Sequence, residues 1–162
     1  MPPMSANYVS ISIEKASVAE VTASLEAFLG VAFSTDQTAY VVGLKLWLAD
    51  LTDETAYTQR FLKEHGIEDP NSVWRELDAR SFPVEIQLSA MLGLFGDLCR
   101  DAVADAVARN LSRDLGVRTV LSIDNGTVPF GIYQGGKSIR DFKAEYTGQF
   151  ADRGWIPRSL LP

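Results

Sequence analysis

The sequence predicts an α+β fold: a two-layer sandwich with a mixed or mostly antiparallel sheet and helices on one face. Strand and helix patterns follow one another in the order strand, helix, strand, helix, helix, strand, helix, strand, strand, which fits this architecture best. The 162 residues are 46% hydrophobic and 22% charged, ordinary values for a globular chain. We therefore expect residues 1–162 to form a single domain, with residues 143–162 as an irregular tail.

The first third of the chain predicts a strand, a helix and a strand. Residues 8–13 alternate apolar and polar side chains, which is typical of a half-buried strand. Ser17 and Glu20 form a capping-box pattern at the start of a helix that reaches residue 28, and Gly30 is a natural stop. Residues 39–48 are rich in Val, Leu, Tyr and Trp and predict the strongest strand.

The middle of the chain predicts two helices and a less certain element. One helix begins at Thr52 or Asp53 and ends at residue 65, and a shorter helix follows over residues 69–77. The alternation from Val84 to Leu88 indicates a strand, with a helix as the alternative.

The last third predicts one long helix followed by strands. The helix covers residues 91–115. Residues 117–123 and 128–133 predict two strands around a turn at residues 124–126, and residues 134–137 predict a second tight turn before a further strand. The expected apolar face of the helix consists of Leu92, Phe95, Cys99, Ala102, Val103, Ala106, Leu111 and Leu115.

Composition excludes several classes of protein. Cys99 is the single cysteine, so no disulfide forms within the chain, and one cysteine with one histidine (His65) excludes structural zinc. No stretch is long and apolar enough for a membrane span, and no secretory signal is visible, so we expect a cytoplasmic protein without a membrane partner. A pI of about 4.7 argues against nucleic-acid binding.

The sharpest motif runs from Gly131 to Ser138 and matches the phosphate-binding pattern G-x-x-x-x-G-K-[ST]. A working phosphate loop needs a strand before its first glycine and a helix after its last residues. Here Gly131 lies inside an apparent strand, and too few residues follow for a nucleotide-binding core. We therefore interpret the motif as a glycine turn between two strands with Lys137 exposed, and expect neither a cofactor nor a metal.

Catalytic arrangements are otherwise absent from the sequence. His65 lies at a predicted helix end, where a capping role is favoured, and Cys99 lies on the apolar side of the long helix, where cysteine behaves as a small hydrophobe. No G-x-S-x-G pattern surrounds a serine. We expect a protein without catalytic residues, with a nucleotide-binding enzyme that uses residues 131–138 as a minor alternative.

Acidic residues supply the candidate binding residues. Asp97, Asp101 and Asp105 recur every four residues and predict an acidic ridge on the solvent face of the long helix, continued by Arg109 and Arg113. A solvated helix face that complements the helix dipole explains the same pattern. Further carboxylates cluster around residues 50–69, and such a surface attracts a basic protein. The expected partner-binding residues are Asp50, Asp53, Glu54, Asp97, Asp101 and Asp105, with Tyr57 and Trp74 as aromatic contacts.

Two stretches resemble the immunity proteins of bacterial polymorphic-toxin systems. One is the opening strand and helix, residues 8–13 and 18–21. The other is the helix end over residues 111–118, which leads into the acidic glycine turn and aromatic residue of residues 124–130. The resemblance covers well under half of the chain and transfers no functional residue. It implies a cytoplasmic, non-enzymatic binder that blocks the active site of a cognate, basic toxin.

A third function class also fits the sequence. An assembly component could form a homodimer through the strand predicted at residues 39–48. An exposed apolar patch on that strand would favour this alternative.

Overall fold

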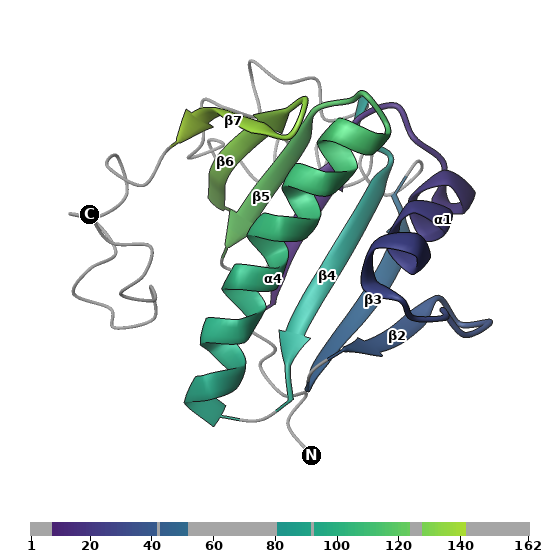
Figure 1. Ribbon diagram of the computed structural model, residues 1–162, viewed down its shortest axis with the longest axis vertical. Coiled ribbons are helices and arrows are strands. Elements are labelled where there is room, and N and C mark those ends of the chain that lie inside the picture. Colours follow the sequence, from purple (N-terminus) through teal and green to yellow (C-terminus); the bar gives the residue numbers. More distant parts are fainter. Residues whose placement is uncertain (1–7, 42, 52–80, 92, 124–127, 142–162) are drawn as a thin grey trace, which may run out of the picture.

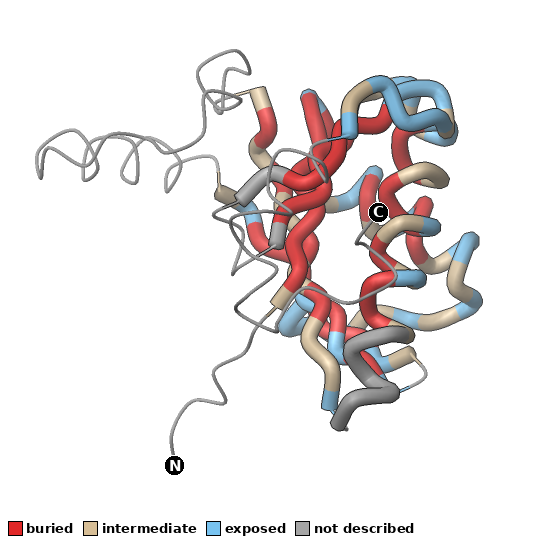
Figure 2. Tube along the Cα trace, turned by 90° about the vertical axis from the view of Figure 1, so that its left-hand side faces the viewer, coloured by how far each residue is buried: buried red, intermediate tan, exposed pale blue. Residues whose placement is uncertain are grey.

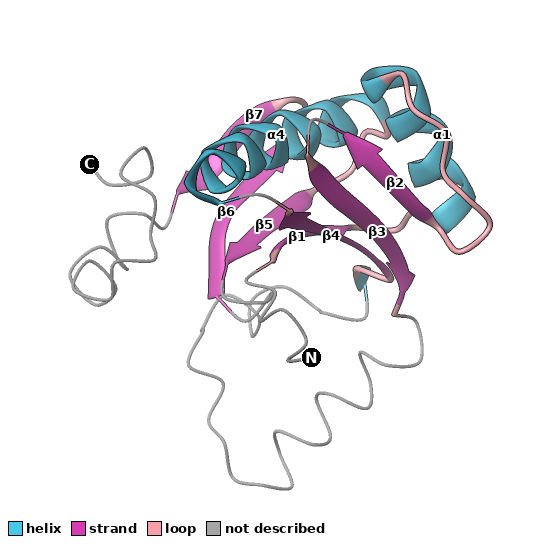
Figure 3. Cartoon of the chain, turned by 90° about the horizontal axis from the view of Figure 1, so that it is seen from below, coloured by secondary structure: helices cyan, strands magenta, loops and turns pink. Residues whose placement is uncertain are grey.

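The described residues form an antiparallel seven-stranded sheet with two helices packed against it, an α+β fold (Figure 1). The computed structural model describes residues 8–41, 43–51, 81–91, 93–123 and 128–141. Both helices lie on the same side of the sheet, so the fold has two layers (Figure 3). In chain order the elements are β1 (Val9–Ile13), α1 (Val18–Leu29), β2 (Thr38–Val41), β3 (Leu44–Asp50), β4 (Val84–Ala90), α4 (Gly93–Asp114), β5 (Thr119–Ile123), β6 (Val128–Gln134) and β7 (Lys137–Asp141).

The strand order β2-β3-β4-β1-β5-β6-β7 places the first described strand at the centre of the sheet. On one side of β1, Val9 lies opposite Leu88 of β4. On the other side, Ser10 lies opposite Ser122 of β5. The strand pairs β2–β3 and β6–β7 at the two edges are hairpins of consecutive strands. The edges are thus built from local pairings, whereas the centre joins strands that are far apart in the sequence.

Helix α1 begins and ends where the sequence predicts. The amide of Glu20 donates to Ser17 Oγ at 3.2 Å, and the Glu20 carboxylate accepts from the Ser17 amide at 2.9 Å, which completes the capping box. Gly30 ends the helix in the left-handed conformation. Within α1, Ser24 Oγ donates to Asp114 Oδ2 of α4 at 2.5 Å. This bond connects the two helices of the helix layer.

The core lies between the sheet and the helices. Helix α4 contributes Ala104, Val107, Ala108 and Leu111, all fully buried. Figure 2 shows the buried residues concentrated along the strands and on the inner side of the helices. We call the sheet face that packs against the helices the helix face. Its apolar residues are Val9, Ile11, Ile13, Leu44, Leu46, Leu48, Val84, Ile86, Leu88 and Leu121.

An ion pair closes one end of β1 against the start of β5. Glu14, buried just beyond β1, accepts hydrogen bonds from Arg118 Nη2 at 2.7 Å and from Arg118 Nε at 3.0 Å. The Arg118 amide donates a third bond to the same carboxylate at 3.1 Å. The side-chain hydrogen bonds from Arg118 hold the pKa of Glu14 below its usual value, and they outweigh burial, which acts in the opposite direction.

The strand from Val84 to Leu88, for which a helix was the alternative, is confirmed as β4. The predictions over residues 8–13, 17–28 and 91–115 are also confirmed, with small shifts of their ends. The strands predicted over residues 117–123 and 128–133 are β5 and β6. The helices predicted over residues 52–65 and 69–77, the turn at residues 124–126 and the tail at residues 143–162 lie outside the described residues.

One predicted element is wrong. Residues 39–48 do not form a single strand, because the chain reverses direction between β2 and β3 and Val41 pairs with Leu44. Gly43 lies in this turn with a φ of 75°, a left-handed conformation that glycine adopts without steric cost. Because the residues on both sides of Gly43 are mostly apolar, the sequence pattern did not indicate a turn.

Candidate protein-binding surface

The sheet face opposite the helices, which we call the second face, differs in chemistry from the helix face. Successive side chains of a strand point to opposite faces, so the register assigns every alternate residue to it. No described helix lies on this face (Figure 3). Its residues are Ser10, Ser12, Thr38, Tyr40, Lys45, Trp47, Ala49, Glu85, Gln87, Ser89, Val120, Ser122, Ile132 and Arg140.

Exposure on the second face increases from β5 towards the β2 edge. Ser122 of β5 and Ser10 of β1 are 0% and 1% exposed. Gln87 of β4 is half-buried. Trp47 of β3 is 41% exposed and Tyr40 of β2 is 60% exposed. The accessible part of the second face therefore covers β2, β3 and β4.

Three exposed side chains of the β2–β3 hairpin form what we call the aromatic patch: Tyr40, Lys45 and Trp47. Tyr40 lies opposite Lys45 in the register, and Trp47 follows two residues later on the same face of β3. On β4, Ser89 lies opposite Lys45 and Gln87 lies opposite Trp47, so hydrogen-bonding groups border the aromatic rings. Exposed Trp and Tyr side chains are the types that dominate protein–protein binding energies.

Two serine hydroxyls lie side by side near the centre of the second face. Ser10 and Ser122 are directly opposite each other in the pairing of β1 with β5. Among the described residues, neither hydroxyl oxygen has a hydrogen-bond partner, although both are buried. A buried hydroxyl without a hydrogen-bond partner lowers the stability of the folded state. The hydroxyl groups of Ser10 and Ser122 therefore do not stabilise the fold.

The structure places few of the predicted partner-binding residues on an accessible surface. Asp50 is exposed at the end of β3. Asp53, Glu54, Tyr57 and Trp74 lie outside the described residues, as does His65. Asp97 lies within α4, but its side chain is outside the described part of the structure.

The predicted acidic ridge on the solvent face of the long helix is wrong at Asp101, which is buried, whereas the Asp105 side chain is 40% exposed. Asp101 is only 6% exposed and accepts a hydrogen bond from Arg100 Nε at 3.2 Å. The buried residues of α4 are Arg100, Asp101, Ala104, Val107, Ala108, Leu111 and Ser112, so the helix packs on the sheet with a different side from the one that the sequence predicts. The physical reason is that alanine is tolerated on either face: Ala102 and Ala106, which we expected inside, are exposed, whereas Ala104 and Ala108 are buried.

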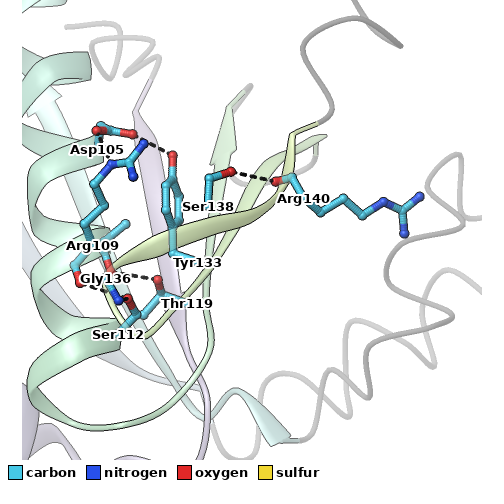
Figure 4. Close-up of polar contacts among 9 residues, drawn as sticks. Asp105, Arg109, Ser112, Thr119, Tyr133, Gly136, Ser138 and Arg140 are labelled. Carbon is cyan, nitrogen blue, oxygen red and sulfur yellow. Dashed lines mark hydrogen bonds and ion pairs between the residues drawn. The ribbon is translucent and has the colours of Figure 1, made fainter.

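Asp105 belongs to a contact between α4 and β6, the Asp105 cluster, which consists of Asp105, Arg109 and Tyr133 (Figure 4). The Tyr133 hydroxyl donates to Asp105 Oδ1 at 2.7 Å, and Arg109 Nε donates to Asp105 Oδ2 at 2.8 Å. The Arg109 guanidinium lies 4.9 Å from the centroid of the Tyr133 ring. The predicted ion pair between Asp105 and Arg109 is thereby confirmed, but both side chains fasten the helix to the sheet.

The environment of Tyr133 keeps it protonated. Burial and the hydrogen bond to Asp105 raise the pKa of Tyr133 far above its usual value. The Asp105 carboxylate in turn raises the pKa of Arg109. A neutral tyrosine donor and a permanently charged arginine fit a structural contact better than proton transfer.

The phosphate-binding motif is a β-hairpin, as the sequence analysis interpreted it. Gly131 lies within β6, and Lys137 opens β7 opposite Gln134, with its side chain exposed. Gly135 and Gly136 between the strands both have positive φ, which a two-residue type I′ turn requires. Strand β7, and not a helix, follows the turn directly, so the turn amides do not lie at a helix N-terminus as in a phosphate loop.

The glycines of this motif have structural roles. The Gly136 amide donates to Ser112 Oγ of α4 at 3.0 Å, which holds the hairpin turn on the helix (Figure 4). A Cβ atom at Gly131 would lie 3.3 Å from the Tyr133 hydroxyl oxygen, so the missing side chain makes room for that ring. These contacts account for the motif without a ligand.

The described part of the chain offers no metal site and no helix that could span a membrane. It contains no group of three or more His, Cys, Asp or Glu side chains placed to hold an ion. None of its helices is both long and apolar enough to cross a bilayer. Cys99, expected on the buried side of α4, is of intermediate exposure.

No family model, no curated protein and no solved structure matches this chain.

Sequence reasoning missed the aromatic patch. The sequence analysis named residues 39–48 as a candidate homodimer contact, but it interpreted the segment as one strand and did not single out Tyr40 and Trp47. Gly43 was the available signal, because a glycine between two apolar runs marks a turn. With the hairpin in place, alternation assigns Tyr40, Lys45 and Trp47 to the same face.

Proposed function

We propose that the protein is a non-enzymatic protein-binding module, an immunity protein that neutralises a cognate bacterial toxin in the cytoplasm by covering its active site. The observation that supports a binding role best is the aromatic patch on the second face. The resemblance of two stretches of the sequence to immunity proteins supplies the toxin as partner.

The patch has the composition of a protein contact. Tyr40 and Trp47 are large aromatic side chains that are exposed to solvent. Lys45, Ser89 and Gln87 surround them with polar groups. An aromatic centre with a polar border is the usual arrangement of an interface that forms and dissociates.

The rigid support of the patch also favours binding. β3 pairs along its whole length with β4, from Leu44 opposite Ala90 to Asp50 opposite Val84. On the other side of the same strand, Leu44, Leu46 and Leu48 are fixed in the core. A partner therefore meets side chains whose backbone is already ordered, which lowers the entropic cost of binding.

Affinity capture from the native host tests this function with three forms of the full chain: the wild type, Trp47→Ala and Phe28→Ala. Phe28 on α1 is the matched control, because its 43% exposure is close to that of Trp47 and it lies in the helix layer. We expect the wild type and Phe28→Ala to retain one stoichiometric partner that Trp47→Ala loses.

The captured protein must then behave as a toxin. The purified partner should have a toxic activity that an equimolar amount of the wild-type protein abolishes. The inhibition constant of Trp47→Ala for the same activity should be at least about tenfold higher. A partner retained equally by all three forms, or a partner whose activity the protein leaves unchanged, would contradict the proposal.

A further inference from the structure

Three of the five exposed large hydrophobic side chains in the described part of the chain lie in one corner of the sheet. Two of them, Tyr40 and Trp47, belong to the aromatic patch, and the third is Met91, which is 57% exposed directly after β4. The other two, Phe28 and Ile139, lie on α1 and on β7 at the opposite edge of the sheet. Single exposed hydrophobic residues are ordinary, whereas a group of them bordered by polar residues marks a contact site.

Met91 extends the accessible part of the second face beyond the aromatic patch. Its amide donates to the Gly43 carbonyl at 2.9 Å, so the pairing of β3 with β4 continues by one row past the end of β4. Continued alternation points the Met91 side chain to the second face, as it does for Ser89 two residues earlier. Lys45, which lies opposite Ser89, therefore has Met91 as its diagonal neighbour.

Lys45 is a cation among apolar side chains. Tyr40 lies opposite it on β2, Trp47 follows two residues later on β3, and Met91 lies diagonally across from it. Within the described part of the chain, no hydrogen bond or ion pair holds its ammonium group. The one acidic residue that the register places on the second face among the described residues, Glu85, lies two rows away, about 13 Å at the rise of a β-strand.

The charge of Lys45 restricts what this corner can bind. A neutral apolar surface would bury the ammonium group without a partner, which weakens binding. A basic surface would bring two positive charges together. A carboxylate with apolar neighbours fits both parts of the surface, because it pairs with Lys45 while its neighbours cover the aromatic rings.

We propose that an acidic, apolar segment of the partner protein binds at this corner, with one of its carboxylates on Lys45. Its apolar side chains cover Tyr40, Trp47 and Met91. The inference rests on the proposed function, because it names the chemistry of the toxin surface that the aromatic patch covers. Such a partner differs from the basic partner that the net charge of -6 indicates, since the charge at the contact, and not the total charge, decides which groups pair.

Nuclear magnetic resonance with two synthetic peptides tests the charge preference. Both peptides are blocked at their ends, and they alternate leucine with glutamate in one case and with lysine in the other. The reporter is the indole N–H signal of Trp47, which is identified by its absence from Trp47→Ala. We expect the glutamate peptide to shift this signal in a saturable way and the lysine peptide to leave it unchanged. A signal that neither peptide shifts, or that the lysine peptide shifts at least as much, overturns the proposal.

A charge reversal tests the role of Lys45. Lys45→Glu should raise the dissociation constant of the glutamate peptide at least about tenfold and should let the lysine peptide shift the Trp47 signal. Lys137→Glu is the matched control and should behave as the wild type, because Lys137 is also exposed but lies on β7 at the opposite edge of the sheet. Circular dichroism confirms that both variants are folded. An unchanged dissociation constant in folded Lys45→Glu, or an equal loss in both variants, overturns the proposal.

This contact and the proposed function can fail separately. A toxin that is captured through Trp47 and binds Lys45→Glu as tightly as the wild type overturns the acidic contact and leaves the immunity function standing. A peptide preference that Lys45→Glu reverses, without any captured toxin that depends on Trp47, supports the acidic contact and contradicts toxin neutralisation.

Discussion

The two faces of one strand show how differently this sheet uses its side chains. On β3, Leu44, Leu46 and Leu48 point into the core beneath the helices, whereas Lys45 and Trp47 between them are exposed. The backbone is shared, so the difference lies only in what each face meets. The helix face buries apolar area beneath the helices, whereas the second face leaves the side chains of Lys45 and Trp47 exposed to solvent.

Leu46→Ala should have the largest effect on stability. Leu46 is fully buried in the core, so its truncation removes apolar contacts and leaves a cavity, with a loss of about 2–5 kcal/mol in the free energy of unfolding. Trp47→Ala, at the next residue of the same strand, should cost less than about 1 kcal/mol. Denaturant unfolding of both variants measures the contrast. Equal losses would show that the second face is as much a part of the core as the helix face.

Glu14→Gln should follow, with a loss of about 1.5–3 kcal/mol from the charged hydrogen bonds to Arg118. The folded state lowers the pKa of Glu14, so its contribution is fully present above the ordinary pKa of 4.5 and is lost as the pH falls through the lowered value. Unfolding curves of wild type and variant, measured at a series of pH values, should therefore converge under acidic conditions. A difference that stays constant down to acid pH would rule out the ion pair as its source.

Asp105→Asn should cost about 1–2 kcal/mol, because it weakens the bonds from Tyr133 and Arg109 that fasten α4 to β6. Tyr133→Phe removes one of the same bonds, so the two losses should not add. A double-mutant cycle by denaturant unfolding gives their coupling energy. Additive losses would mean that the hydroxyl of Tyr133 and the carboxylate of Asp105 act independently.

Ser122→Ala should have the smallest effect and the opposite sign. The substitution removes a buried hydroxyl that has no partner among the described residues, so stability should be unchanged or should rise by up to about 1 kcal/mol. Thr119→Val, on the helix face of the same strand, is the control, because Thr119 Oγ1 donates to the Ala108 carbonyl at 2.9 Å and should lose stability. A clear loss for Ser122→Ala would show that its hydroxyl is hydrogen-bonded in solution.

The sequence predicted the elements better than their orientation. The ends of α1 were predictable from Ser17, Glu20 and Gly30, because helix capping depends on only a few neighbouring residues. The rotation of α4 was not predictable in the same way, since its alanines fit a buried and an exposed position equally well. Asp101 was therefore assigned to solvent, but it is buried beside Arg100.

Sequence reasoning reached the segment that carries the candidate surface, as a homodimer contact over residues 39–48, but not the arrangement of its side chains. Tyr40 and Trp47 meet only because a turn at Gly43 folds the chain back on itself, and the turn lies between two apolar runs that resemble one strand. The resemblance to immunity proteins proposed a partner but transferred no residue. What the sequence supplied correctly was the class of fold and the interpretation of residues 131–138 as a glycine turn between two strands, both of which depend on the order of elements.

The central position of β1 has a consequence for how the chain reaches its native state. Its partners, β4 and β5, follow much later in the sequence, and Val9 cannot meet Leu88, nor Ser10 meet Ser122, until those segments have left the ribosome. Pairings between distant segments form slowly, because the long loop between them must close first. During synthesis β1 is the first described strand to be made, yet it can acquire both neighbours only after β5 has been made, and until then its hydrophobic side chains lack the strands that cover them in the sheet.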